Sequence, residues 1–270
     1  MSQPSHARRF QGSDAYTDLK QGLGLTSLAW KMALLKLRNQ YRGSMLGPFW
    51  ITISSAVFFI GLAIVYSQLW GLDLAEYFPW LAIGFSCWIL ISTAISEACA
   101  CMISAEALIK TKPMPISLFA MRNAFSLTLF FAHQLPLFLC VFPFLGKWPG
   151  ASVLILPISF FFIVVNAFLL SFVMGMACAR FRDLEQVVAS ILQLFFFLTP
   201  IIWKPEMLGP NAVLVYFNPL ASFIEVIRAP ILGQEISPYC WPIIFGVTVL
   251  NALLAYFLLQ RYRARIVFWV

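Results

Sequence analysis

The sequence predicts an all-α membrane protein with six transmembrane helices, an N-terminal amphipathic interface helix and a re-entrant outer hairpin between helices five and six. The chain is 61% hydrophobic and only 11% charged, which is too apolar for a soluble domain. Its apolar residues form six long uncharged stretches, and most Lys and Arg residues lie between alternate stretches. Spans at this density leave no room for strands, so we expect a helical bundle.

Each of the six uncharged stretches is long enough to cross a bilayer. A helix crosses the hydrocarbon core in about 20 residues, and the shortest stretch has 18. We expect the second span to continue past Glu97, and only His133 interrupts the third. The predicted spans are 46–69, 77–96, 123–146, 148–179, 186–203 and 236–260.

Positive charge predicts which side of the membrane each connection faces. Of the 18 Lys and Arg residues, 15 lie in four segments, namely 1–43, 105–122, 180–185 and 261–270. Lys and Arg near membrane spans are retained in the cytoplasm, so both termini are expected to be cytoplasmic. Because the net charge of +7 follows this pattern, it does not indicate a nucleic-acid partner.

The apolar run 207–224 is predicted not to cross the membrane. It contains Gly209-Pro210 and Asn218-Pro219, two strong helix breakers. A seventh span would also place the basic C-terminal segment outside, against the charge pattern. We therefore interpret the run as a broken, re-entrant or interfacial hairpin on the outer side, where protein or a water-filled cavity must surround it.

The segment before the first span is predicted to be an amphipathic helix in the cytoplasmic interface. Placed on a helix, its apolar residues share faces that basic residues flank. It is either a basic anchor that sets topology or a helix that also packs on a cytoplasmic partner. The residues singled out are Trp30, Leu34, Leu37, Arg38, Tyr41 and Arg42.

These patterns divide the chain into a polar cytoplasmic tail at 1–25, a transmembrane domain at 26–265 and a short cytoplasmic tail at 266–270. Two ionisable residues lie inside predicted spans. We expect Glu97 to snorkel or to bond another helix, and His133 to be a satisfied structural histidine. The outer acidic residues are scattered and the cysteines match no ligand spacing, so no catalytic or metal site is predicted.

Several motifs, taken together, resemble one family. The stretch 40–50, QYRGSMLGPFW, looks like the entry to the first span of polysaccharide-exporting ABC-transporter permeases. Matches at 179–184 (ARFRDL), 199–203 (TPIIW) and 217–220 (FNPL), the last followed by Arg228, lie in the expected order. The resemblance covers about residues 25–265 and is closest to the O-antigen (lipopolysaccharide) branch, ahead of the capsule and teichoic-acid branches.

The resemblance implies a bacterial inner-membrane permease that works as a homodimer with two copies of a cytoplasmic P-loop ATPase. Such permeases export a lipid-linked polysaccharide through a channel between the two subunits. Their short cytoplasmic helix between spans two and three docks in the ATPase, which here implies Glu106, Ala107, Leu108 and Lys110. Broken helices before the last span form an outer gate, which here implies Pro210, Asn218 and Pro219.

Two polar stripes are the predicted polysaccharide path, on the first and fifth spans that line the channel in the resembling family. Amide and hydroxyl groups suit sugar hydroxyls, and aromatic rings suit their C–H faces. The alternative is helix packing, in which Ser and Gln also join helices. The stripes comprise Thr52, Ser55, Phe59 and Tyr66 on the first span, and Gln186, Ser190, Gln193 and Phe197 on the fifth.

The energy source is not in this sequence. It contains no G-x-x-x-x-G-K-[ST] loop, so ATP and Mg are expected in the partner ATPase, and no cofactor is expected in this chain. Two other classes stay open. An ion-coupled secondary transporter usually has broken helices in both halves, whereas only the second half is broken here. An intramembrane transferase acting on lipid-linked sugars would need a carboxylate or His–Asp arrangement.

Overall fold

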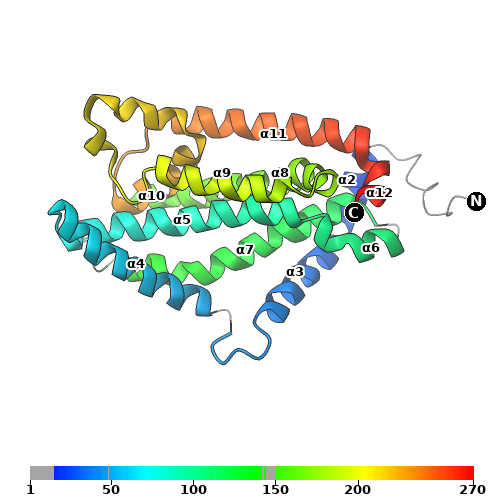
Figure 1. The fold of residues 1–270 in the computed structure, drawn as a ribbon, viewed down its shortest axis with the longest axis horizontal. Coiled ribbons are helices and arrows are strands. Elements are labelled where there is room, and N and C mark those ends of the chain that lie inside the picture. Colours follow the sequence, from blue (N-terminus) through cyan, green and yellow to red (C-terminus); the bar gives the residue numbers. More distant parts are fainter. Residues whose placement is uncertain (1–14, 48, 113, 142, 144–149) are drawn as a thin grey trace, which may run out of the picture.

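The computed structural model describes residues 15–47, 49–112, 114–141, 143 and 150–270, which form helices and connecting turns. Figure 1 shows an elongated bundle in which α5, α7, α8, α9 and α11 run along the long axis. Helix α10 lies at one end of the bundle, and α2, α6 and α12 lie at the other. The α-helices are α2 (Ala15–Gly24), α3 (Thr26–Gln40), α4 (Phe49–Trp70), α5 (Leu74–Ala100), α6 (Glu106–Thr111), α7 (Ile116–Val141), α8 (Leu156–Arg180), α9 (Leu184–Leu198), α10 (Pro219–Leu232), α11 (Cys240–Tyr262) and α12 (Ile266–Trp269). The 3₁₀ helices are η1 (Ile103–Ala105), η3 (Ala151–Ile155), η4 (Pro205–Phe217) and η5 (Arg263–Arg265).

Four helical segments among the described residues are long and apolar enough to cross a membrane, against six in the prediction. They are Phe49–Trp70, Leu74–Ala100, Ala151–Arg180 and Cys240–Trp269. Helix α7, which has 26 residues, is not among the four, and α9 is a shorter apolar helix of 15 residues. The expected continuation of the second span past Glu97 is confirmed, because α5 ends at Ala100.

Helix α5 is the centre of the bundle. It packs against α4, α7, α8 and α10, and most of its side chains are buried. At its N-terminal end, the carboxylate of Asp73 accepts a hydrogen bond from Ala75 N at 3.1 Å and caps the helix. In a bilayer, the contacts of α5 with its neighbouring helices are stabilised by close packing rather than by the hydrophobic effect. A central, enclosed α5 therefore holds both ends of the bundle in register.

The two predicted tails are folded where the structure describes them. Residues 15–24 of the expected polar tail 1–25 form α2, and Asp18 on that helix is completely buried. The Asp18 carboxylate accepts hydrogen bonds from Ile116 N and Ser117 N, each at 2.9 Å, at the start of α7. In the expected tail 266–270, Ile266 and Val270 are buried in the core beside α8. Both segments therefore pack against the bundle where the structure describes them.

The predicted break between spans five and six is present. Helix η4 is interrupted at Gly209, which has φ +54° and ψ −127°. Residue Asn218 then caps α10 by accepting a hydrogen bond from Leu220 N at 3.0 Å, and Pro219 occupies the first turn, where its missing N–H is tolerated. With 14 residues, α10 is shorter than the roughly 20 that a span requires.

Candidate functional site

The predicted polar stripe on α9 is exposed on the surface of the single chain. Gln186, Ser190, Gln193 and Phe197 all lie on the outward side, and Phe197 is 62% exposed. The opposite side of α9 holds the helix to α5, where Phe196 contacts Phe85 with 5.3 Å between ring centroids. One polar helix face is therefore presented to whatever surrounds the protomer.

The predicted stripe on α4 lies inside the chain instead. Ser55 and Phe59 are buried, and the Phe59 ring lies 5.2 Å from that of Phe85 on α5. Thr52 donates a hydrogen bond to the carbonyl of His133 on α7, and Tyr66 packs on Trp70 at 5.1 Å. The structure does not bring the two stripes together within one protomer. For Ser55 and Phe59, it places the side chains in the helix-packing role that the sequence left open.

The short helix proposed for coupling is present as α6. Lys110 Nζ lies 2.6 Å from Glu106 Oε1 across one turn, as the i, i+4 spacing predicts. This hydrogen bond and the lysine charge hold the pKa of Glu106 below its usual range. Leu108 packs partly into the adjoining core while Ala107 is exposed. The helix is thus anchored on one side and free on the other, at the end of the bundle that also holds α12 (Figure 1).

The predicted interface helix corresponds to α3, and small residues rather than the expected large apolar ones form its fully buried face. The small residues Ala29 and Ala33 are fully buried where α3 packs against α7. Trp30 is 39% exposed and meets Phe125 edge-on, with 5.4 Å between ring centroids. Of the other residues named for this helix, Leu34, Leu37 and Tyr41 are half-buried, and Arg38 and Arg42 are exposed. The alanines permit the close helix approach, which an apolar-face argument overlooks.

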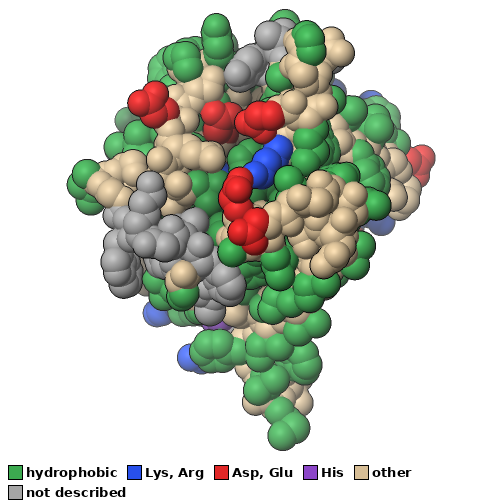
Figure 2. Space-filling view, turned by 90° about the vertical axis from the view of Figure 1, so that its left-hand side faces the viewer, with side chains coloured by type: hydrophobic (Ala, Val, Ile, Leu, Met, Phe, Trp, Pro, Cys, Tyr) green, Lys and Arg blue, Asp and Glu red, His purple; other side chains and the backbone are tan. Residues whose placement is uncertain are grey.

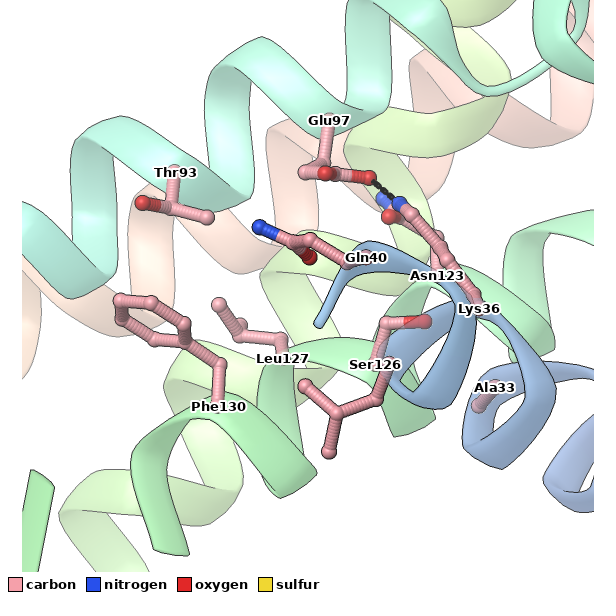
Figure 3. A pocket seen from close by; sticks show the side chains of 10 residues that line it. Ala33, Lys36, Gln40, Thr93, Glu97, Asn123, Ser126, Leu127 and Phe130 are labelled. Atoms are coloured by element: carbon pink, nitrogen blue, oxygen red, sulfur yellow. Dashed lines mark hydrogen bonds and ion pairs between the residues drawn. The ribbon is translucent and has the colours of Figure 1, made fainter. Parts of the chain in front are cut away.

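A polar cavity of about 190 Å³ lies between α3, α5 and α7 (Figure 3). Lys36 from α3 forms an ion pair with Glu97 from α5 at its wall. Sequence reasoning singled out Glu97 but missed Lys36. The available signal was that an intramembrane carboxylate needs a partner and that α3 carries lysines. The cavity's polar lining consists of Lys36, Gln40, Thr93, Glu97, Asn123 and Ser126.

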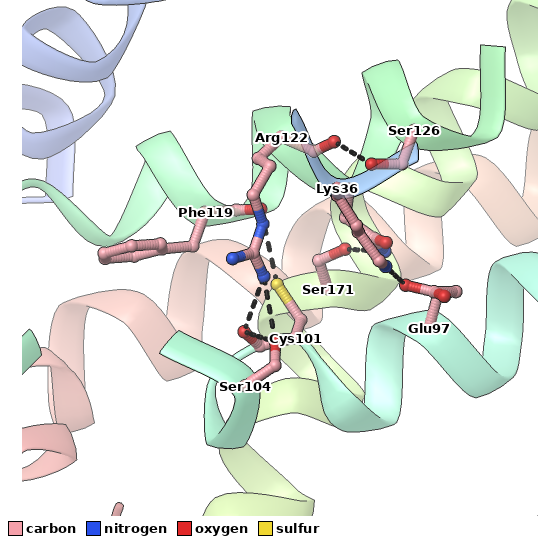
Figure 4. Close-up of polar contacts among 9 residues, drawn as sticks. Lys36, Glu97, Cys101, Ser104, Phe119, Arg122, Ser126 and Ser171 are labelled. Atoms are coloured by element: carbon pink, nitrogen blue, oxygen red, sulfur yellow. Dashed lines mark hydrogen bonds and ion pairs between the residues drawn. The ribbon is translucent and has the colours of Figure 1, made fainter. Parts of the chain in front are cut away.

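Arg122 links α7 to the turn that precedes α6 (Figure 4). Its Nη2 atom donates to Ser104 Oγ at 2.9 Å and to the Cys101 carbonyl at 3.3 Å. The next residue, Asn123, donates to Ser171 Oγ on α8 at 2.8 Å. These bonds join α7 to the turn before α6 and to α8, and the pair between Lys36 and Glu97 joins α3 to α5.

At the opposite end, the residues named for the outer gate lie beside a buried cation. Asn218 donates to Thr199 Oγ1 at 2.8 Å, which ties the start of α10 to the end of α9. Pro210 is exposed on η4, and Pro219 is half-buried. Arg228 on α10 is 3% exposed and donates to the Pro200 carbonyl at 2.6 Å. Figure 2 shows acidic side chains gathered around a basic one on this end of the molecule.

Comparison with known proteins adds a family and several relatives. The family described as "ABC-2 type transporter" matches residues 27–232. The chain is 21% identical over 197 residues to the O-antigen export system permease protein RfbA of Myxococcus xanthus, covering 72% of this chain and 76% of the relative. Two proteins of the same name from Klebsiella pneumoniae are 25% identical over 190 residues and 24% identical over 233. They cover 70% and 84% of this chain, and 73% and 89% of their own lengths.

Proposed function

The chain belongs to the ABC-2 type transporter family, and from that premise we propose that it is the transmembrane subunit of an ATP-driven exporter. Its substrate is a lipid-linked polysaccharide of O-antigen type, moved across the bacterial inner membrane. The observation that carries this proposal is the similarity to three O-antigen export permeases over 70–84% of the chain.

The exposed stripe on α9 supports a path between two copies of the chain. Amide and hydroxyl groups facing lipid are unfavourable, so Gln186, Ser190 and Gln193 need protein or water beside them. In a homodimer, two such faces would enclose a polar path, with Phe197 offering a ring for the C–H faces of sugars. Membrane lipid would cover the apolar outer surfaces of α4 and α11, where Phe58 and Phe257 are exposed.

Coupling to ATP requires a partner chain. We place a P-loop ATPase, with its ATP and Mg, against α6, where Ala107 and Lys110 are exposed. Nucleotide-driven movement of α6 passes to α7 through Arg122 and its bonds to the preceding turn. The ion pair between Lys36 and Glu97 then connects α5 to the interface helix α3. Both termini lie on this cytoplasmic side.

The opposite end is the outer side in this proposal. The broken pair η4 and α10 does not cross the membrane and forms the outer gate, which includes Pro210, Asn218 and Pro219. Helix α7 and the predicted fifth span 186–203, of which α9 forms the helical part, then complete six spans. Support comes from the breaks at Gly209 and Asn218 and from the sorting of positive charge along the sequence.

The experiment that tests the function pairs this chain with its P-loop ATPase in cells that lack the exporter. Polymer reaching the cell surface and ATP hydrolysis by the purified complex are measured. The double variant Ala107→Glu/Leu108→Glu should lose export while still inserting in the membrane. Gln68→Glu, which adds a charge at the opposite end of the bundle, is the control and should export normally. Normal export by the double variant would remove the assigned coupling role.

A second comparison tests the path on α9. Gln193→Trp should block export without lowering the amount of protein in the membrane. Ile191→Trp is the matched control, because Ile191 is also exposed on α9 but lies well around the helix from the polar stripe. If both variants export equally, the stripe is not the path.

A further inference from the structure

A second polar cavity, of about 200 Å³, lies at the outer end of the bundle, away from α9's exposed stripe. Helix α5 contributes Trp80 to its wall, η4 contributes Glu206, and α10 contributes Glu225 and Arg228. The turn that follows α10 adds Gln234 and Glu235. These side chains come from segments far apart in the sequence, so only the fold assembles them.

Arg228 is the unusual member of this cavity. Its guanidinium lies over the Trp80 ring, 3.4 Å from the ring centroid, and donates to the Pro200 carbonyl. Among the described residues, no carboxylate lies within 4.0 Å of it to form an ion pair. Gly84, one turn after Trp80, leaves the space for it, since a Cβ there would lie 3.1 Å from Arg228 Nη1. A guanidinium has five N–H donors, so this one retains donors for a ligand.

Trp80 positions the guanidinium of Arg228 over its ring. The residue is 7% exposed, and its indole Nε1 has no hydrogen-bond partner among the described residues. Buried indole N–H groups usually find a partner, and an orphan calls for an explanation. The Nε1 atom is itself buried, so the cavity meets other parts of the Trp80 side chain and not this N–H.

The acidic residues of the lining disfavour an anionic ligand. Three carboxylates, Glu206, Glu225 and Glu235, and one guanidinium line the cavity, which is a net charge of −2, and Glu225 Oε1 also accepts a hydrogen bond from Ser237 N at 2.9 Å. An anion would be repelled in this half-enclosed space, where charges act more strongly than in bulk water. A metal ion is not favoured either, because no group of His, Cys, Asp and Glu among the described residues is arranged to hold one.

We propose that this cavity binds an uncharged, hydroxyl-rich sugar ring of the exported polymer. Hydroxyl groups donate to the carboxylates and accept from Arg228, while Ala212 and Val215 in the same wall meet the apolar C–H face. The inference rests on the proposed export function and makes it narrower. The site selects neutral sugars at the outer gate and rejects uronic acids and phosphorylated sugars.

The test measures binding to the purified full chain in lipid nanodiscs by saturation-transfer NMR. Mannotetraose is the neutral probe, and tetragalacturonate is the acidic probe of equal length. The unaltered chain should bind mannotetraose at least about tenfold more tightly, because the lining repels the acidic oligomer. The double variant Glu206→Gln/Glu235→Gln should reduce that preference to less than about threefold by admitting tetragalacturonate. Both side chains are exposed, so this variant is expected to fold.

Arg228→Gln should lose mannotetraose binding, whereas Lys204→Gln should keep it. Lys204 is the matched control, since it is basic, lies at the same end and pairs with Glu76 at 2.7 Å rather than lining the cavity. Equal binding of both probes to the unaltered chain overturns the inference, as does full binding by Arg228→Gln. This assay needs no ATPase. A chain that shows the predicted binding but supports no export leaves the sugar site standing and refutes the export function.

Discussion

Two arginines are almost equally buried at opposite ends of the bundle, and their surroundings differ. Arg263, near the C-terminus, is 5% exposed and lies 2.6 Å from a carboxylate oxygen of Asp18. Arg228, at the end that holds α10, is 3% exposed and has a backbone carbonyl and an indole ring instead of a carboxylate. A buried charge that is paired holds segments together, whereas one without an anion is available to a ligand.

The ion pair between Asp18 and Arg263 joins three parts of the chain. Asp18 belongs to α2, it bonds two backbone N–H groups at the start of α7, and it neutralises Arg263 after α11. The first N–H groups of a helix have no partner inside the helix and favour a negative charge. One carboxylate therefore satisfies a helix terminus and a cation together. Arg228 on α10 instead contacts the Trp80 ring on α5 and the carbonyl of Pro200 after α9.

The largest effect on stability should follow from breaking the ion pair between Asp18 and Arg263. Asp18→Ala removes the carboxylate that lies 2.6 Å from Arg263 and caps the start of α7, and should lower the free energy of unfolding by about 3–5 kcal/mol. Thermal and denaturant unfolding of the full chain in detergent would measure this. The double variant Asp18→Ala/Arg263→Met should recover part of the loss. If Asp18→Ala unfolds like the unaltered chain, the ion pair between Asp18 and Arg263 does not stabilise the fold.

A smaller effect should follow from separating α2 and α7 without touching a charge. A Cβ at Gly22 would lie 2.1 Å from Ser117 Oγ, so Gly22→Ala should destabilise the chain by about 1–3 kcal/mol through overpacking. Gly24→Ala on the same helix is the control, because nothing lies within 4 Å of its added Cβ. The same unfolding measurement applies, and equal stabilities of the two variants would contradict the close packing of α2.

Replacing Arg228 should affect stability less than breaking the ion pair between Asp18 and Arg263. Arg228→Gln removes a buried charge that has no carboxylate, and the lost stacking on Trp80 is offset by the removal of that charge. The free energy of unfolding should therefore change by no more than about 1 kcal/mol. Unfolding in detergent, side by side with Asp18→Ala, provides the measurement. A loss as large as that of Asp18→Ala would make Arg228 a structural residue and erase the difference between the two ends.

The smallest effect is expected at the exposed pair on α6. Because Lys110 lowers the pKa of Glu106 in the folded chain, the pair contributes above the ordinary value of 4.5 and is lost as pH falls through the lowered value. An exposed pair is screened by solvent, so Glu106→Gln should leave unfolding at neutral pH unchanged. Measuring the unfolding of the unaltered chain and of Glu106→Gln at neutral and at strongly acidic pH tests this. A large neutral-pH loss would show that α6 depends on the pair.

Local pattern determined much of this protein from the sequence. Apolar runs predicted the long helices, Gly209 and Asn218-Pro219 predicted the break after α9, and the spacing of Glu106 and Lys110 predicted α6. The ordered motifs also indicated the family. Each of these signals lies within one turn, one span or one short segment, where backbone geometry and solvent preference act directly on neighbouring residues.

Tertiary structure decided which polar residues meet. Asp18 accepts hydrogen bonds from residues 98 and 99 positions away. A single acidic residue in a polar segment does not predict that its carboxylate is buried in such contacts. The α4 stripe turned inward although its periodicity matched that of α9, because helical spacing shows that residues share a face but not what the face contacts. Likewise, Trp80 and Arg228 became neighbours only when α10 packed on α5. Such pairings depend on how helices pack, and no local pattern encodes them.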